Sequence, residues 1–318
     1  MNKILITGAA GFVGSALSEN YLKRGLSVYG VDNFCSGQAE HIERLLKIYP
    51  QLFHFSDFDV TKSWSQLSLP SVDLAFHLAS PASVPVYQRM NLETMWVNSI
   101  GLKNAIEFCD TSQARLVFAS TSEVYGTPAR SPQSETDWGQ VNSYGPRSCY
   151  DEGKRFGEAL IYNSNKRNGT QHGLVRIFNT FGPGMKPDDG RVVSQFIGQA
   201  LRQEDLTVYG SGLQTRSLCF ISDLVRGLAS YAESGLVEPI NLGNDQECSI
   251  LDLAKLIIDL TGSKSKIIFS RLPEDDPPQR CPNLMRAKNL LAFKNEFSLP
   301  AGLKIMIEKM RVGMISTV

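Results

Sequence analysis

The stretch GAAGFVG, with glycines at Gly8, Gly11 and Gly14, constrains this chain more than any other feature. It follows the apolar run KILIT (3–7) and precedes a helical pattern that begins SALSENYLKR. Glycine at a first strand-to-helix turn lets the backbone approach a pyrophosphate, and the helix N-terminus supplies amide donors. The next apolar run ends in Asp32, at about the distance where an acid meets the adenosine ribose hydroxyls. The sequence therefore predicts a site for NAD rather than NADP, because a carboxylate repels a 2'-phosphate. The alternative is that the glycines serve only a tight turn.

Buried-strand patterns recur in the first half of the chain and alternate with amphipathic stretches of helix length. The strand-like runs lie at 3–7, 26–31, 53–58, 73–79, 114–120 and 173–178, and helical stretches include 11–24 and 91–109. This alternation predicts a Rossmann-type α/β fold over residues 1–178, with a doubly wound parallel sheet.

A Gly/Pro-rich loop after residue 178 opens a smaller C-terminal α/β lobe, predicted over residues 179–318. Some of its segments are expected to return to the Rossmann domain. We expect helices to outnumber strands in this lobe, with helices at 191–203, 223–234, 249–261 and 301–312. The two lobes should meet over the carboxyl edge of the sheet, where ligands of such folds bind.

Charge and composition exclude several classes of partner. Thirty-two Lys and Arg residues against 32 Asp and Glu residues leave no net charge to attract nucleic acid or a membrane. The six cysteines form no CxxC pair and the four histidines show no ligand spacing, so we expect reduced thiols and no metal. No run reaches the roughly 18 apolar residues of a membrane span, and the chain begins directly with a strand-like run. We therefore expect a soluble cytoplasmic protein.

The stretch SCYDEGKR (148–155) places Tyr150 and Lys154 one helical turn apart, so both side chains project from one face. A charged run of this kind is ordinarily the polar face of a surface helix. Free tyrosine titrates near pH ~10, but a neighbouring ammonium group and an oxidised nicotinamide favour its phenolate. Tyr150 is therefore a candidate catalytic base.

These motifs, with HLAS (77–80) and STSEVYG (120–126), occur in an order that resembles the extended short-chain dehydrogenase/reductase family, the NAD-dependent sugar-nucleotide epimerases and dehydratases. The likeness spans nearly the entire chain. Blocks outside the cofactor fold, such as RIFNTFGP, LTVYGSGLQTR and the Arg280 of DDPPQRCPN, look most like the UDP-glucuronate decarboxylases, or UDP-xylose synthases.

This resemblance implies NAD as cofactor and a UDP-sugar as substrate. It also implies a homodimer formed by two long helices, here 91–109 and 150–168. The implied reaction converts UDP-glucuronate to UDP-xylose through a 4-keto intermediate, with internal recycling of NADH.

The resemblance also assigns catalytic roles. Tyr150 would take the proton of the sugar 4-hydroxyl, Lys154 would hold the nicotinamide ribose, and Thr121 would steady the forming carbonyl. Ser122, Glu123 and Arg280 would contribute to the sugar and decarboxylation site.

The identity of Ser122 bears on the reaction type. Hexose 4,6-dehydratases of the family usually carry Asp at this position, and because serine is a much weaker acid, the sequence disfavours elimination of water. Decarboxylation needs no such donor, since a 4-ketone makes the C5 carboxylate a β-keto acid. A turn-capping role for Glu123 and simple strand-end polarity for Ser122 are the alternatives.

The family's binding residues map onto this chain in two sets. The cofactor set is Gly8, Gly11, Phe12, Val13, Gly14, Asp32, Asn33, Asp59, Val60, Leu78, Ala79, Ser80, Tyr150 and Lys154. The substrate set is Pro81, Ser83, Glu123, Asn179, Arg191, Val192, Tyr209, Arg216 and Arg280. Guanidinium groups suit the paired oxygens of a diphosphate, although without the resemblance these arginines would be interpreted as surface residues. His77 is interpreted as a packed histidine rather than a catalyst.

The stretch 84–98 departs from the family pattern, because Trp96 stands where the family has a lysine that suits an anionic sugar. A tryptophan platform would equally suit a neutral sugar face, and Arg147 or Arg280 could supply the missing charge. A related nucleotide-sugar 4-epimerase or 4-dehydrogenase is therefore the second hypothesis. A non-catalytic NAD-binding protein is the third, since a fold alone does not establish activity.

Overall fold

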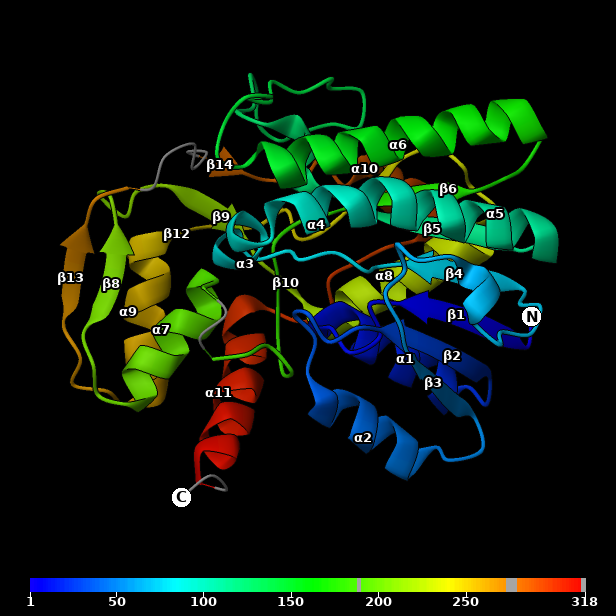
Figure 1. Cartoon of the computed structure of the whole chain (residues 1–318). Helices are drawn as coiled ribbons and strands as arrows, with labels where there is room; N and C mark the ends of the chain where they lie inside the picture. The colour runs from blue at the N-terminus through cyan, green and yellow to red at the C-terminus, as the bar shows by residue number, and fades with distance from the viewer. Residues whose placement is uncertain (188–189, 273–278, 316–318) are drawn as a thin grey trace.

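A computed structural model describes residues 1–187, 190–272 and 279–315, and it places seven strands in one parallel sheet (Figure 1). The strand order is β11-β6-β5-β4-β1-β2-β3, and each neighbouring pair runs parallel. The strands are β1 (Lys3–Thr7), β2 (Ser27–Asp32), β3 (Phe53–Asp57), β4 (Leu74–His77), β5 (Arg115–Thr121), β6 (Gly173–Ile177) and β11 (Ile240–Leu242). The order reverses between β1 and β4, so the Rossmann-type fold predicted from the sequence is confirmed, with its topological switch point at β1.

Both faces of the sheet are covered, which explains why its strands are apolar at successive positions. In β1, Ile4 and Ile6 enter one buried cluster and Leu5 enters the other. One face carries α1 (Phe12–Lys23), α2 (Ala39–Ile48) and α8 (Ile221–Ser234), and the other carries α4 (Asn91–Trp96), α5 (Leu102–Ser112) and α6 (Ser148–Asn168) (Figure 1). The π-helical turn η2 (Val97–Gly101) joins α4 to α5, so the predicted helix at 91–109 is continuous.

The part of the chain beyond residue 178 differs from the expectation that helices outnumber strands. Its described residues form eight strands and five helices. Besides β11 these strands are β7 (Thr180–Phe181), β8 (Leu206–Tyr209), β9 (Thr215–Ser217), β10 (Cys219–Phe220), β12 (Glu247–Ser249), β13 (Ile267–Ser270) and β14 (Gln279–Arg280). Strands of two to four residues are too short to show a period-two pattern, so sequence periodicity could not reveal them.

The helices predicted for this part are all present. Besides α8 they are α7 (Val192–Leu201), α9 (Ile250–Thr261) and α11 (Leu299–Ile315), and α10 (Met285–Leu291) is an addition. Although β11 and α8 come from beyond residue 178, they complete the sheet and its cover. The remaining short elements are α3 (Val84–Arg89), η1 (Trp64–Gln66) and η3 (Ser122–Tyr125).

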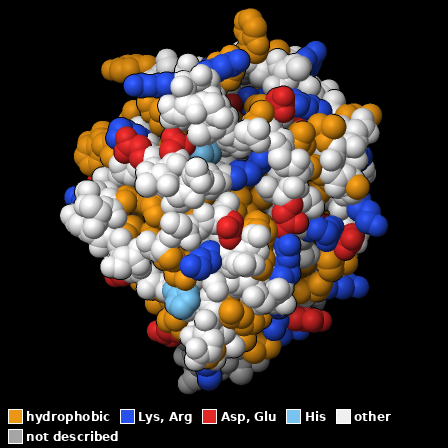
Figure 2. Space-filling view, turned by 90° about the vertical axis from the view of Figure 1, so that its right-hand side faces the viewer, with side chains coloured by type: hydrophobic (Ala, Val, Ile, Leu, Met, Phe, Trp, Pro, Cys, Tyr) orange, Lys and Arg blue, Asp and Glu red, His pale blue; other side chains and the backbone are white. Residues whose placement is uncertain are grey.

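The surface shows no separation of charge by sign on the face drawn in Figure 2, where lysine and arginine side chains are interspersed with aspartate and glutamate. All six cysteines are free thiols. Within the described part of the chain, no helix combines the length and the apolar character needed to cross a membrane.

Candidate active site

The turn between β1 and α1 requires glycine at two positions. Gly8 has a φ of +75°, and a Cβ there would lie 2.7 Å from the backbone nitrogen of Ala79. A Cβ on Gly14 would lie 2.0 Å from the carbonyl oxygen of Gly8. The first turn of α1 thus packs directly against the end of β1, which is the arrangement in which helix N-terminal amides bind a pyrophosphate.

Asp32, at the end of β2, fastens this turn to the neighbouring strand. Its Oδ2 accepts a hydrogen bond from the backbone nitrogen of Ala10 at 3.0 Å, and its Oδ1 accepts one from that of Phe34 at 2.8 Å. Burial raises the pKa of the carboxyl group, although these backbone hydrogen bonds oppose the shift. The predicted ribose ligand therefore also has a structural role that sequence reasoning missed.

A cavity of about 210 Å³ lies along this edge of the sheet. Nine of the predicted cofactor residues line it: Gly8, Gly11, Asp32, Asn33, Asp59, Val60, Leu78, Ala79 and Ser80. The predicted substrate residue Pro81 lines it too, whereas Phe12, Val13 and Gly14 form the first turn of α1. A glycine cradle at one end and a buried acid at the end of β2 fit a dinucleotide.

Trp96 lines this same cavity, together with Met90 and Glu93. Its side chain is partly exposed and comes from α4. Because this cavity is lined by the predicted cofactor residues Asp59 and Val60 and also by the predicted substrate residue Pro81, the expectation that position 96 faces the sugar stays a prediction.

Tyr150 and Lys154 project from the first two turns of α6 into the protein, so the alternative of a polar surface face is wrong. Both side chains are buried, at 7% and 2% exposure. The Lys154 Nζ donates to the carbonyl oxygen of Ala119 at 2.7 Å and lies 5.7 Å from the centroid of the Tyr150 ring. Burial lowers the pKa of Lys154 to about 7. Burial also raises the pKa of Tyr150, although a hydrogen bond with the Thr121 side chain opposes this shift.

Tyr87, which sequence reasoning missed, packs against the predicted base. The rings of Tyr87 and Tyr150 are stacked with centroids 5.0 Å apart and planes 6° from parallel. The Tyr87 hydroxyl is buried and has no hydrogen-bond partner among the residues the structure describes. A lone tyrosine in the short helix α3 carries no sequence signal that would have revealed this position.

A buried ion cluster lies at the end of β5, beside the base. Glu123 Oε2 accepts a hydrogen bond from Arg147 Nη2 at 2.5 Å and another from Arg280 Nη2 at 2.7 Å. Ser122 Oγ donates to Glu123 Oε1 at 3.4 Å. Burial alone would raise the pKa of Glu123, but Arg280 and Arg147 hold it well below the usual range of a glutamate. Glu123 is therefore an ionised carboxylate between two guanidinium groups and not merely a turn cap.

The second lobe brings its arginines to this cluster through a small sheet. Strands β14 and β9 pair in parallel, with Arg280 in register with Arg216, and both side chains are buried. Arg191 precedes α7 and lies over the ring of Phe12, 5.8 Å from its centroid, which joins the lobe to the start of α1. The interpretation of Arg216 and Arg280 as surface residues is therefore wrong.

The other predicted substrate residues occupy varied positions. Ser83 is buried just before α3, and Val192 is the first residue of α7. Tyr209 ends β8 and is 39% exposed, and Asn179 lies between β6 and β7. Their roles toward a nucleotide remain predictions.

A buried polar network supports the base and the cluster from behind. Glu158, one turn beyond Lys154, accepts hydrogen bonds from Ser120 Oγ at 2.5 Å and from Arg176 Nη2 at 2.7 Å. Arg176 Nη1 also donates to the Tyr125 hydroxyl at 2.9 Å. The network therefore ties α6 to the ends of β5 and β6. Sequence reasoning did not identify it.

His77 is a packed histidine, as predicted, and it is fully buried. Its Nδ1 lies 3.0 Å from Thr7 Oγ1 and its Nε2 lies 3.1 Å from the carbonyl oxygen of Val97. Full burial, with a contribution from Lys154, lowers the pKa of the ring to about 3.

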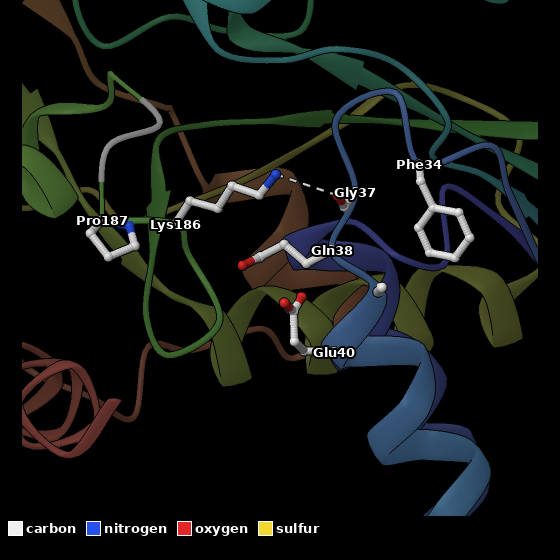
Figure 3. Close-up of a pocket in the computed structure, with 7 residues that line it drawn as sticks. Phe34, Gly37, Gln38, Glu40, Lys186 and Pro187 are labelled. Carbon is white, nitrogen blue, oxygen red and sulfur yellow. Dashed lines mark hydrogen bonds between the residues drawn. The ribbon is translucent and has the colours of Figure 1, made fainter. Parts of the chain in front are cut away.

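A second and larger cavity, of about 560 Å³, opens where the loop after β7 meets the loop after β2 (Figure 3). Lys186 Nζ donates to the carbonyl oxygen of Gly37 at 3.4 Å, and Gln38 Nε2 donates to that of Gly184 at 2.9 Å. These contacts join the two lobes. None of the predicted catalytic residues is among the residues that line this cavity.

Comparison with known proteins is consistent with this geometry. The model of the NAD dependent epimerase/dehydratase family matches residues 4–243. The UDP-glucuronic acid decarboxylase 1 of Xenopus tropicalis is 46% identical over 309 residues, which cover 97% of this chain and 72% of that protein.

Solved structures share the whole fold. The UDP-glucose 4-epimerase of Thermotoga maritima has a TM-score of 0.90 at 26% identity, covering 98% of this chain and 99% of that one. The UDP-glucuronic acid 4-epimerase of Bacillus cereus, solved with UDP-glucuronic acid and NAD, has a TM-score of 0.84 at 26% identity, with the same coverage of 98% and 99%.

Proposed function

The chain belongs to the NAD dependent epimerase/dehydratase family, and from this premise we propose that it is a UDP-glucuronate decarboxylase that forms UDP-xylose and carbon dioxide. Identity of 46% to a UDP-glucuronic acid decarboxylase, against 26% to 4-epimerases of the same fold, supports this reaction. The observation that carries the proposal is the buried cluster of Glu123, Arg147 and Arg280 beside Tyr150. Guanidinium groups form paired hydrogen bonds with carboxylates, so such a cluster suits a sugar that carries a carboxylate of its own.

NAD is the cofactor, and when bound it would supply a reversible hydride acceptor for C4 of the sugar. Gly8 and Gly11 would cradle the pyrophosphate, and Asp32 would accept hydrogen bonds from the adenosine ribose. Asp59 and Val60 line the same cavity and would flank the adenine. Lys154 would hold the nicotinamide ribose.

The residues around C4 and C5 of the sugar would carry out proton transfer and stabilise the 4-keto intermediate. Tyr150 accepts the proton of the 4-hydroxyl, and Thr121, which hydrogen-bonds to it, steadies the carbonyl that forms. The C5 carboxylate is then a β-keto acid and leaves as carbon dioxide, and the electron pair passes to an enolate at C4 and C5. A proton from solvent replaces the lost carboxylate at C5, and Tyr150 returns its own proton to the 4-oxygen when the ketone is reduced. Ser122 offers no acid for loss of a 6-hydroxyl, which argues against a dehydratase.

Mass spectrometry of the sugar nucleotides tests this function. The purified protein would be incubated with UDP-glucuronate and NAD, with the Tyr150→Phe variant as control. The proposal predicts a sugar nucleotide lighter by carbon dioxide and no net NADH from the parent protein, and neither change from the variant.

The same experiment separates the alternatives. A product of unchanged mass but inverted at C4 would identify a 4-epimerase, the class of the two solved structures compared above. Stoichiometric NADH with a stable 4-keto sugar would identify a dehydrogenase. NAD binding without turnover of any UDP-sugar would identify a non-catalytic protein.

We also propose a homodimer in which α4 and α6, which pack side by side, contribute the interface (Figure 1). Leu92, Met95 and Ile100 on the α4 side and Phe156 on α6 are large apolar side chains that are 43–53% exposed. Exposed apolar groups in neighbouring helices favour association. Light scattering should give twice the chain mass, and a monomer mass would refute the dimer. The cytoplasmic location stays a prediction, which cell fractionation would test.

A further inference from the structure

Gln133 is a buried residue in the long loop that joins η3 to α6, and this loop pairs with the chain just after Arg280. The backbone nitrogen of Gln133 donates a hydrogen bond to the carbonyl oxygen of Cys281 at 2.8 Å. The backbone nitrogen of Asn283 donates in turn to the carbonyl oxygen of Gln133 at 2.7 Å. These two bonds form a parallel β-bridge, so the loop lies against the segment that carries Arg280 into the site.

The side-chain amide of Gln133 adds a further bond to the residue next to Arg280. Its Oε1 accepts a hydrogen bond from the backbone nitrogen of Cys281 at 2.8 Å, and its Nε2 donates to the carbonyl oxygen of Arg130 at 3.1 Å. Because one neighbour is a donor and the other an acceptor, both ends of the amide are assigned. Gln133 is 1% exposed and the bond to Cys281 is buried, so loss of Oε1 would take from a buried N–H its partner in the structure.

The same loop holds the guanidinium group of Arg280. Arg280 Nη1 donates to the carbonyl oxygen of Gly126, at the start of the loop, at 2.6 Å, and Nη2 donates to Glu123 Oε2 at 2.7 Å. The strand β14 that contains Arg280 has only two residues and pairs with β9. The loop therefore fixes Arg280 twice, through its guanidinium group and, one residue further on, through its backbone.

Asn241, on β11 of the central sheet, fastens this contact to the Rossmann domain. Its Nδ2 donates to the carbonyl oxygen of Gln133 at 3.0 Å, and its Oδ1 accepts from the Tyr125 hydroxyl at 2.7 Å. Its backbone nitrogen donates to Glu135 Oε1, in the same loop, at 2.9 Å. Gln133 is thus held against the sheet and transmits that position to the chain beside Arg280.

We propose that Gln133 is a positioning residue for Arg280. Its amide oxygen holds the backbone of Cys281 and thereby the direction from which the Arg280 guanidinium group meets the sugar. The inference rests on the proposed function, in which Arg280 contributes to the decarboxylation site. It assigns to the second half of the reaction a residue that makes no bond to the base.

A shift of Arg280 should slow one step and spare the other. Oxidation at C4 depends on Tyr150, Lys154 and Thr121 in the proposed function, and the contacts of Gln133 given above involve none of them. A displacement of about 1 Å in a catalytic group can cost about 10²-fold in rate. We therefore expect the loss of carbon dioxide to slow by about 10–100-fold when the Gln133 oxygen is removed, whereas hydride transfer to NAD keeps its rate.

A single-turnover reaction separates the two steps. The NAD-loaded protein, in excess, would be mixed with UDP-glucuronate labelled with a carbon isotope at the carboxyl group. The absorbance of NADH reports the oxidation, and labelled carbon dioxide reports the decarboxylation. Calorimetric titration with NAD shows beforehand that each variant is folded.

Three variants are compared with the parent protein. Gln133→Met replaces the amide by an apolar chain of similar length, and Gln133→Asn keeps an amide that is one methylene too short. Gln140→Met is the matched control, because it makes the same substitution in the same loop. Gln140 is exposed and bonds to Tyr125 and Thr127 through its backbone.

The expected result is a change in one step only. In Gln133→Met, NADH should form at the parent rate but persist, because the hydride returns only after carbon dioxide has left. Gln133→Asn should show the same pattern, and Gln140→Met should match the parent. Release of carbon dioxide at the parent rate in Gln133→Met would overturn the proposal. Equal slowing of both steps would also overturn it, since this would show a structural role alone. If Gln133→Met does not fold, Gln133→Asn decides by the same comparison.

The two proposals fail differently. Release of carbon dioxide by the parent, with an unchanged time course in the Gln133 variants, would overturn the role of Gln133 alone. Absence of labelled carbon dioxide from the parent protein, with NAD bound, would overturn the proposed function itself.

Discussion

The cofactor half of the site and its charged half are built in different ways. The cofactor half depends on backbone geometry within one short stretch, where Gly8 and Gly14 allow β1 and α1 to touch. The charged half joins Glu123, Arg147 and Arg280, which lie up to 157 residues apart in the chain. We expect the first half to bind the cofactor, which many reactions share, and the second half to select the sugar. A local motif therefore identifies the cofactor, whereas the substrate depends on long-range assembly.

The largest effect on turnover is expected at Tyr150, where the two halves meet. Tyr150→Phe keeps the ring that stacks on Tyr87 but removes the base, so turnover should fall by about 10²–10⁴-fold. Product formation measured by mass spectrometry checks this. Tyr162→Phe, on the same helix but 62% exposed, should retain full turnover. Equal rates in Tyr150→Phe and the parent would remove Tyr150 from the mechanism.

The next largest effect is a loss of stability, which should be greater for the buried ion cluster of the charged half than for an exposed ion pair. Glu123→Gln leaves two buried guanidinium groups without their shared carboxylate, so the free energy of unfolding should fall by about 3–5 kcal/mol. Glu107→Gln, in an ion pair with both partners about 60% exposed, should change it by at most about 1 kcal/mol. Urea denaturation of both variants measures the two changes in the free energy of unfolding. Similar losses would show that the buried cluster contributes no more to stability than the surface ion pair.

A smaller effect is expected in the cofactor half. Gly14→Ala places a Cβ 2.0 Å from the Gly8 carbonyl oxygen, so the turn must shift at a cost of about 1–3 kcal/mol. NAD affinity should fall by at least about tenfold, as measured by calorimetry. Gly153→Ala is a control within a helix, since its nearest contact would be an ordinary 3.5 Å. Unchanged NAD affinity in Gly14→Ala would contradict the role of this close approach.

The smallest effect concerns the pH dependence of stability. Burial lowers the pKa of Lys154 to about 7 from 10.5, so between these values the unfolded chain binds more protons than the folded one. Stability should therefore rise with pH in this window, by roughly 1 kcal/mol per unit, and the rise should be absent in Lys154→Met. Denaturation of both proteins near pH 7 and near pH 9 measures the difference. A parallel pH dependence in the two proteins would show that Lys154 is not the group responsible.

The sequence predicted the two halves unequally, for physical reasons. The fold, the glycine turn and the pair Tyr150 and Lys154 follow from contiguous patterns, because each depends on residues within one or two turns. The pairing of Glu123 with Arg147 brings together residues separated by a long loop, and no periodicity reports such a contact. Tyr87 was missed because a single buried tyrosine leaves no sequence pattern.

One expectation about the second half of the chain failed because of the length of its strands. The short strands beyond residue 178 escaped detection because strands such as β14 contain only two residues. That strand nevertheless positions Arg280, so an element too short to predict carries part of the predicted site.

The most direct test of the central claim is to follow the carboxyl carbon itself. The NAD-loaded protein would be given UDP-glucuronate labelled with a carbon isotope at the carboxyl group, and the released gas would be analysed. We predict labelled carbon dioxide in a one-to-one ratio with UDP-xylose, and none from Tyr150→Phe. Label that remains entirely in the sugar nucleotide, with NAD bound and the substrate present, would contradict the assignment of the charged half to decarboxylation.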